Sequence, residues 1–249
     1  PATSASASRA GRSRARVAAP VLVASAVGYD PAGLAALTRT ATLPAVPLAT
    51  DVLVALASAG GEVTPATTIT WPAGWTEIAA SPALGQRGVK SLAIALGSAG
   101  QSVMATFNTP SILSGVTLAQ VRGAVASPLL SALSNLDHPV PSLFPMPSIN
   151  PPARDLLLLA FVFWQNAYGV SSSPPGLANV ARGVSNNGGT SSVNDLWALT
   201  ATPAAGPYAG SFVYGVGGGD PVFWAAIQVA MQPDPASPAF AGEPGGGVW

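Results

Sequence analysis

Short apolar runs, each bounded by Gly, Pro, Ser or Asn, recur along the whole chain. Runs of this length and composition predict β-strands. They cover residues 21–27, 51–58, 75–79, 91–97, 102–107 and 117–121, and then residues 155–164, 177–184, 193–200, 210–216 and 222–231. Helical spacing is nearly absent, although leucines between Ser127 and Leu136 follow a Ser and a Pro and predict one short helix. The pattern therefore predicts an all-β fold.

The two parts of the chain resemble each other in order. Asp51–Ala55 aligns with Asp155–Leu159 at an offset of 104 residues. Pro72–Trp75 then aligns with Pro174–Leu177, residues 91–96 with 195–200, and residues 118–121 with 226–229. Each part reads as about five strands, which must bury an apolar face. We therefore expect a β-sandwich built from two pseudo-repeated halves, although the sequence leaves open whether these form one sandwich or two small domains.

The expected domain organisation follows from changes in composition. A basic arm covers residues 1–18, and the sandwich covers residues 19–232. Within the sandwich, the halves 19–126 and 153–232 are joined by a Pro-rich strap, residues 127–152. Residues 233–249 form a Pro- and Gly-rich tail without an apolar period, and such a segment does not fold by itself.

Several short motifs have structural rather than chemical roles. Asp51 and Asp155 precede apolar runs, where a carboxylate caps a turn through local backbone hydrogen bonds. The Pro-x-Gly elements at Pro72 and Pro174 supply a fixed φ followed by a residue that tolerates positive φ, which predicts chain reversals. The sequence Asn186-Asn187-Gly188-Gly189 predicts a hairpin.

Composition narrows the functional classes. Only 8% of the residues are charged, with ten basic and ten acidic side chains, so the surface must be mostly neutral and suits packing against other proteins. The absence of Cys excludes disulfides and thiolate metal sites. The longest apolar run, Leu156–Trp164, is too short to cross a bilayer as a helix, and we expect no membrane insertion.

The N-terminal arm is the one basic segment. It carries Arg9, Arg12, Arg14 and Arg16 and no acid, and we expect these arginines to dock onto an acidic neighbour. Four arginines without interleaved aromatic residues are a weak nucleic-acid footprint, so binding to nucleic acid is not expected.

No arrangement of residues indicates catalysis. The only imidazole, His138, lies in the strap, and the acids are scattered singly. Glu77 shares a predicted strand face with Trp75, but we interpret it as a solvent-facing acid at a sheet margin. The run Gly215–Asp220 lacks the following helix that a phosphate loop needs, and it predicts a turn. We therefore expect a non-enzymatic protein without catalytic, cofactor-binding or metal-binding residues.

Aromatic side chains are the remaining candidates for ligand binding. Trp164, Trp197 and Trp224 lie inside apolar runs and are expected in the core. Trp71 and Tyr168 lie near predicted turns, where an exposed ring could stack on a sugar. They are the two candidate ligand-stacking residues.

Six segments together resemble minor tail and virion-surface β-sandwich proteins of tailed bacteriophages that infect actinobacteria. They are Asp51–Ala57, Trp71–Glu77, Ser91–Leu96, Val121–Gly123, Asp155–Phe161 and Ala225–Met231. The resemblance spans roughly residues 20–232, while the basic arm, the strap and the tail depart from it. It implies a jelly-roll-like sandwich that is part of a phage particle.

These observations give a leading expectation and alternatives. The leading one is a structural minor tail protein at the distal tail, made in the host cytoplasm and assembled with other virion proteins, and with copies of itself, through its arms and sheet edges. A capsid decoration or head-fibre protein is the nearest alternative. A carbohydrate- or receptor-binding module that contacts host surface glycans belongs to a different class, and a cell-wall hydrolase has the weakest support.

Overall fold

A computed structural model describes residues 18–60, 67–81, 89–111, 113–133, 136–138, 143–151, 156–165, 170–186, 191–199, 207–214 and 222–236. Within these residues there is no α-helix, and a single 3-10 turn covers Gly97–Ala99. The rest is strands and their connections, which confirms the predicted all-β sandwich. No helix in this part of the chain is long and apolar enough to cross a membrane.

The strands fall into two groups along the chain, which we call the first half and the second half. The first half holds β1 (Val21–Tyr29), β2 (Ala36–Thr42), β3 (Val52–Gly60), β4 (Ile69–Thr70), β5 (Thr76–Ser81), β6 (Val89–Leu96), β7 (Ser102–Ser111) and β8 (Leu113–Arg122). The second half holds β9 (Leu129–Leu130), β10 (Leu136–His138), β11 (Leu143–Ile149), β12 (Leu157–Gln165), β13 (Val170–Ser172), β14 (Leu177–Asn186), β15 (Ser191–Leu199), β16 (Tyr208–Tyr214) and β17 (Val222–Met231).

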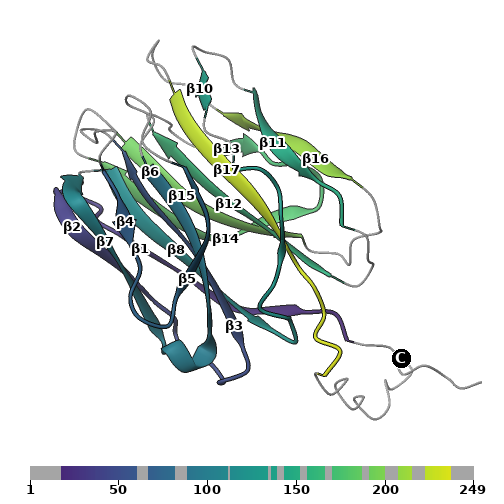
Figure 1. Cartoon of the computed structure of the whole chain (residues 1–249). Coiled ribbons are helices and arrows are strands. Elements are labelled where there is room, and N and C mark those ends of the chain that lie inside the picture. Colours follow the sequence, from purple (N-terminus) through teal and green to yellow (C-terminus); the bar gives the residue numbers. More distant parts are fainter. Residues whose placement is uncertain are drawn as a thin grey trace, which may run out of the picture.

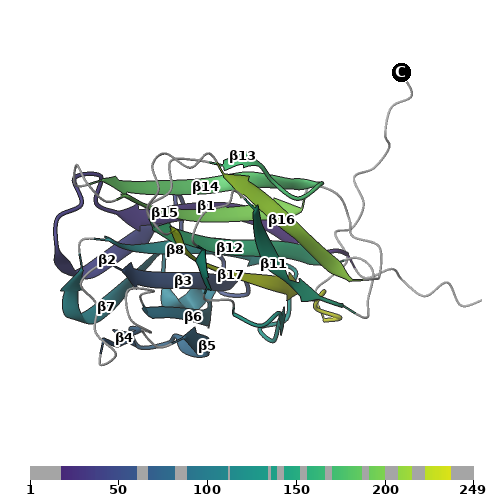
Figure 2. The same cartoon turned by 90° about the horizontal axis from the view of Figure 1, so that it is seen from above.

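The described strands form four antiparallel sheets. Two larger ones, which we call the central sheets, have the orders β1-β8-β3-β6-β5 and β10-β17-β12-β15-β14, with β9 also paired to β17. Two three-stranded outer sheets have the orders β2-β7-β4 and β11-β16-β13. Figure 1 shows the outer sheets on opposite sides of the molecule with the central sheets between them, and the view from above in Figure 2 shows the same separation.

The two halves have the same topology. In the first central sheet the middle strand β3 lies between β8, the last strand of its half, and β6, which pairs with β5. In the second, β12 lies between β17, the last strand of its half, and β15, which pairs with β14. If β2, β7 and β4 are matched with β11, β16 and β13, the outer sheets also share one order. The repeat seen in the sequence therefore corresponds to a repeat of strand order.

The largest apolar core lies between the central sheets and is shared by both halves. It includes Val54 and Leu56 of β3 and Leu159 and Phe161 of β12, all with at most 1% of their surface exposed. A separate core fills the space between the first central sheet and β2, β4 and β7. Each central sheet is thus covered on both faces, which explains why every residue of β3 is buried.

One end of the shared interface is polar. The hydroxyl of Ser58 on β3 donates a 2.6 Å hydrogen bond to Asn194 Oδ1 on β15. Within the described residues, four further buried groups around it have no hydrogen-bond partner: Thr117 Oγ1, Ser185 Oγ, Ser192 Oγ and Asn194 Nδ2. The ladder pairs Ser185 with Ser192, and Ser192 lies two residues from Asn194 on the same face, so these groups are neighbours.

The predicted alignment of the first repeated strand is wrong, because it puts matched residues on opposite faces of their sheets. An offset of 104 matches Val54 with Leu158, but Val54 belongs to the shared core whereas Leu158 faces the outer core of the second half. Since side chains alternate between faces, the true offset must be odd at this strand. The alignment of Gln120 with Gln228 puts both glutamines on the outer face of their sheets, because the flanking residues Ala119 and Ile227 both lie in the shared core. Through the ladders it matches Leu53 with Ala160, an odd offset of 107.

The helix predicted over residues 127–136 is wrong for its described part. Leu129 and Leu130 form β9 and pair with Ala230 and Val229 at the edge of a central sheet. Ser131 accepts a hydrogen bond from the Gln228 N–H. Sheet pairing replaces the local helical preference here, because the leucines gain burial against β17.

The described parts of the Pro-rich strap are extended, and their strands pair with the second half. β9 and β10 pair with β17, and β11 pairs with β16. β11 contains Pro145 and Pro147, which lack the N–H of a central strand, and it lies at a sheet edge, where proline is tolerated.

The two predicted Pro-x-Gly turns are confirmed, whereas the turn predicted at Gly215–Asp220 lies outside the described residues. The N–H of Trp75 donates to the Pro72 carbonyl, with Gly74 at φ 86°, and the N–H of Leu177 donates to the Pro174 carbonyl, with Gly176 at φ 80°. Both bonds are 3.2 Å long. Asn186 pairs with Ser191 in the antiparallel ladder of β14 and β15, which confirms the predicted hairpin.

Candidate functional site

A cleft of about 300 Å³ opens at one margin of the first half. It lies between β4, β5 and β6 and is lined by Thr67, Thr68, Ile69, Glu77, Ala80, Ser81, Val89, Lys90 and Ser91. Glu77 is exposed on the edge strand β5, as the sequence predicts for a solvent-facing acid, while Ser91 on the neighbouring strand β6 is buried. The cleft therefore presents a carboxylate to solvent above a buried hydroxyl.

A chain of hydrogen bonds holds this carboxylate. The indole N–H of Trp71 donates to Ser91 Oγ at 2.6 Å, and the Ser91 hydroxyl donates to Glu77 Oε2. Trp71 also stacks on Trp75, with ring centroids 5.7 Å apart and planes inclined by 18°. Since Trp75 takes up one face of Trp71 and Ser91 takes up its N–H, only part of this predicted ligand-stacking residue is open to a ligand.

Lys90 does not complete a catalytic arrangement with Ser91. The two residues are consecutive in β6, so their side chains leave opposite faces of the sheet. The Lys90 side chain is fully buried toward the second half, with Nζ 5.6 Å from the centre of the Phe163 ring. The serine therefore has a carboxylate as its acceptor and the lysine lies elsewhere, so this arrangement positions Glu77 rather than activating Ser91.

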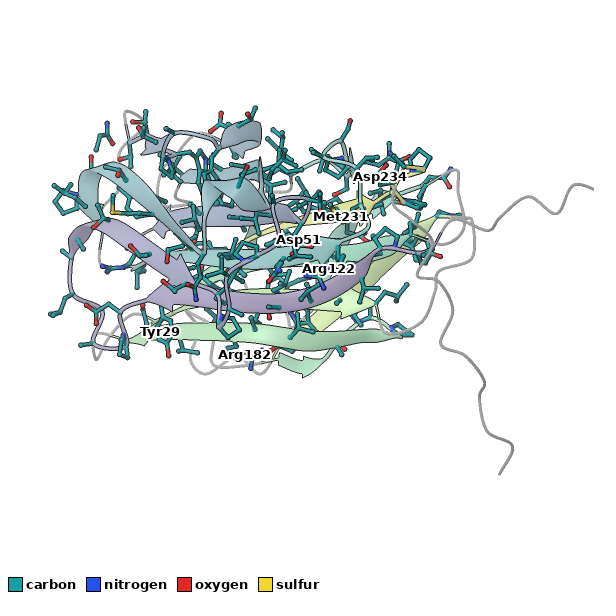
Figure 3. All side chains as sticks on the ribbon, turned by 90° about the horizontal axis from the view of Figure 1, so that it is seen from below. Tyr29, Asp51, Arg122, Arg182, Met231 and Asp234 are labelled. Carbon is teal, nitrogen blue, oxygen red and sulfur yellow. The ribbon has the colours of Figure 1, made fainter. Side chains whose placement is uncertain are left out.

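Asp51 forms the most connected polar group of the first half. Its buried carboxylate accepts two hydrogen bonds from Arg122, at 2.8 and 3.0 Å, and one from Gln120 Nε2. Figure 3 shows the Asp51 and Arg122 side chains next to each other. The backbone N–H of Leu48 also donates to Asp51, at 2.9 Å, which confirms the predicted capping of the preceding turn. The counterpart Asp155 lies outside the described residues.

The pKa of Asp51 reflects two opposing effects. Burial raises it, but the hydrogen bonds from Arg122, Gln120 and Leu48, together with the charge of Arg122, outweigh burial and hold the pKa below its ordinary value. The same contact with Asp51 raises the pKa of Arg122. The pair is charged and serves to join β3 to β8.

A comparable ion pair lies in the second half. Arg182 on β14 donates to both oxygens of Asp195 on β15, at 2.8 and 2.7 Å. The Asp195 side chain is fully buried and the Arg182 side chain is 36% exposed. Both pairs link neighbouring strands of a central sheet, which is a structural role.

Three edge strands of the central sheets carry ladder irregularities. The register shifts at Val23 in β1, at Ile78 in β5 and at Val180 in β14. β1 and β14 lie beside each other, and Ser25 Oγ donates to the Val180 carbonyl at 2.9 Å. Exposed valines continue along both edges: Val21, Val23, Val180 and Val184. Bulges of this kind interrupt the backbone pattern that a further strand would need.

Of the remaining residues singled out from the sequence, some are buried in the core and others lie outside the described part of the chain. Trp164 and Trp197 are buried core residues, as predicted, and the Trp224 side chain lies outside the described part. His138 belongs to β10, where only its backbone is described. Tyr168 and the arm residues Arg9, Arg12, Arg14 and Arg16 lie outside the described residues.

Sequence analysis missed two buried polar residues: Ser91 of this cleft, and Gln228 in the second half, whose amide donates to the carbonyls of Pro147 and Tyr208. Ser91 interacts with Trp71 and Glu77 from a neighbouring strand, and no local pattern marks such a contact. Gln228 could have been found, because it is the counterpart of Gln120 in the repeat and an amide inside an apolar strand needs partners.

The described residues contain no group of three or more His, Asp or Glu side chains that could hold a metal ion. Comparison of the chain with family models, curated proteins and solved structures finds no match.

Proposed function

We propose that the chain is a non-enzymatic structural subunit of a bacteriophage virion, as a minor tail protein at the distal tail. In this proposal the two pseudo-repeated halves build a jelly-roll-like sandwich. One observation carries the proposal: the polar side chains of the segments that resemble virion proteins bind one another. Arg122 of one segment holds Asp51 of another, and Trp71 and Glu77 of a third hold Ser91 of a fourth.

This arrangement favours a framework role over chemistry. Asp51 is fully buried and its carboxylate has four hydrogen-bond donors, so it is unavailable to a substrate. A protein whose characteristic polar residues connect strands is built for rigidity, which a particle subunit needs.

The proposed partners are other virion proteins and further copies of the chain. The low charge and the exposed valines of β1 and β14 suit contact with a neutral protein surface. Because bulges interrupt these edges, we expect the edges to contribute side-chain contacts, while the arm with Arg9, Arg12, Arg14 and Arg16 docks on an acidic neighbour.

Immunogold electron microscopy of purified particles tests this proposal, with antibody against the exposed face of β7. Label at the tail tip is expected. Label over the shell would instead support the capsid decoration or head-fibre alternative. Particles without label, from which mass spectrometry also finds the chain absent, would overturn both.

A receptor- or carbohydrate-binding module is the second candidate, and the cleft beside Trp71 favours it. An exposed carboxylate fixed next to an aromatic pair is a common way to orient a sugar hydroxyl. Binding of host envelope glycans that weakens in Glu77→Gln, but not in the control Asp30→Asn, at a half-buried carboxylate outside the cleft lining, would support it. Equal binding by both variants would contradict it.

A further inference from the structure

A second cavity, of about 200 Å³, lies in the second half between its central sheet and its outer sheet. Its lining includes Met146, Leu158, Pro175, Leu177, Ala209 and Gln228. Pro175 and Ala209 are exposed and mark its mouth, whereas Gln228 is fully buried and marks its inner end. No lining side chain is charged, so the cavity suits a neutral and mainly apolar ligand.

The repeat shows what is missing from this place. The matched turns Pro72–Trp75 and Pro174–Leu177 have the same backbone hydrogen bond and the same positive φ at glycine. In the first turn Trp75 stacks on Trp71, and both pack against the outer core. In the second turn, Leu177 and Ser173 occupy the matched positions. Two indole rings of the first half are therefore replaced by two smaller side chains.

The outer core of the second half is also arranged differently from that of the first half. In the first half the described residues form one continuous cluster, with Trp71 and Trp75 among its partners. In the second half the described core residues form two clusters, one with Met146 and Leu177 and the other with Leu158. The cavity is lined by residues of both clusters and by Leu199, which packs against both, so it lies between them.

Gln228 provides a polar group at the inner end. Its Nε2 donates to two backbone carbonyls, those of Pro147 and Tyr208. Because both partners are carbonyls, the amide orientation is settled, and the oxygen is the atom left over. Within the described residues Gln228 Oε1 is buried and has no hydrogen-bond partner. A buried acceptor of this kind is destabilising unless a donor reaches it.

We propose that this cavity binds one aromatic ring that carries a single N–H or O–H donor, such as an indole or a phenol. The ring occupies the place that the Trp71–Trp75 pair fills in the first half, and its donor reaches Gln228 Oε1. The size is appropriate, since an apolar protein cavity of about 150 Å³ holds benzene. This inference is independent of a role in the virion.

The test uses the full chain and ligand-observed NMR titrations. The probe is 3-methylindole, and its matched control is 3-methylbenzothiophene, which has nearly the same shape but no donor. We expect saturable binding of 3-methylindole and about tenfold weaker binding of the benzothiophene, the effect of one hydrogen bond in an apolar site. Absence of saturable binding, or equal binding of both probes, would overturn the proposal.

Two variants place the binding in the cavity. Leu177→Trp restores the side chain of the first half, and Ala209→Trp fills the mouth from an exposed position, so the fold should tolerate it. Both should abolish binding of 3-methylindole, while Ala45→Trp, at an exposed position of the first half, should leave it unchanged. Binding that survives in a folded Ala209→Trp protein would refute the site.

One further probe distinguishes a tryptophan side chain of a protein partner from a free small molecule as the ligand. N-acetyl-tryptophanamide carries backbone on both sides of its side chain, as a tryptophan of a protein partner would. Binding comparable to that of 3-methylindole supports the cavity as a receptor for a protein side chain. Binding of 3-methylindole alone supports it as a site for a free small molecule.

Discussion

Asn194 of β15 stands over Gly115 of β8 so closely that a Cβ atom on Gly115 would lie 2.4 Å from Asn194 Nδ2 and 2.7 Å from its Cγ. The same asparagine accepts the hydrogen bond from Ser58. The two halves thus meet through an amide that lies against bare backbone, and glycine is needed at residue 115 for reasons of space.

Gly115→Ala should destabilise the protein by about 1–3 kcal/mol, because the added methyl group displaces Asn194 from Ser58. Urea denaturation measures the change. In an Asn194→Ala background the same substitution should cost much less, since the obstructing amide is gone. An equal cost in both backgrounds would show that this contact does not set the spacing of the central sheets.

Asp51→Asn should lower the free energy of unfolding at neutral pH by about 1–3 kcal/mol. The loss should be smaller than for a fully buried ion pair, because 34% of the Arg122 side chain is exposed to solvent. Arg122→Met should have a similar effect, and the double variant should lose little more than either alone.

The pH dependence of this pair has a definite sign. The pKa of Asp51 is lowered in the folded state, so the unfolded chain binds the proton more readily as the pH falls. The contribution of Asp51 is complete above its ordinary pKa of about 3.9 and is lost as the pH falls toward the lowered value. The stability difference between the wild type and Asp51→Asn should shrink in acid, and a constant difference from pH 7 to pH 2 would contradict this assignment.

Phe161→Ala should destabilise the protein by about 3–5 kcal/mol, because the ring is fully buried in the core that both halves share. Hydrogen exchange is the informative measurement. Amides of β3, in the first half, should lose protection together with those of β12. Loss of protection confined to the second half would mean that the halves unfold separately. Phe107→Ala, in the outer core of the first half, serves as the control.

Trp71→Phe should keep an aromatic ring against Trp75 but remove the N–H that holds Ser91. We expect a loss of about 1 kcal/mol in the free energy of unfolding, typical of one hydrogen bond. Ser91→Ala removes both bonds of this chain and should cost at least as much. If Trp71→Phe is neutral while Ser91→Ala is not, the indole N–H does not fix the serine.

The strands that the sequence predicts are those with apolar character, and the missed ones show why others escape prediction. β2 presents Thr38, Thr40 and Thr42 to solvent, while its buried face includes Arg39, whose guanidinium donates to the carbonyls of Leu34 and Ser114. A strand with arginine on its inner face has no apolar alternation to detect.

The repeat was visible in the sequence, but its register was not. Every residue of β3 is buried, and so is each described side chain of β12, because both faces of each central sheet are covered. Without a polar face there is no alternation to distinguish an even offset from an odd one. The candidate site escaped for a related reason: Glu77 meets Ser91 across a ladder, and pairing between strands is a property of the fold.

The two ends of the shared interface should resist separation of the halves to different degrees, because one end is polar and the other is apolar. Apolar burial stabilises the region around Phe161, whereas the end near Ser58 and Asn194 replaces apolar contact with hydroxyl and amide groups that contribute little to cohesion. Under a load that separates the two halves, the joint should open from the polar end while the other end still holds. We therefore expect the two halves to separate in steps under load, and not all at once.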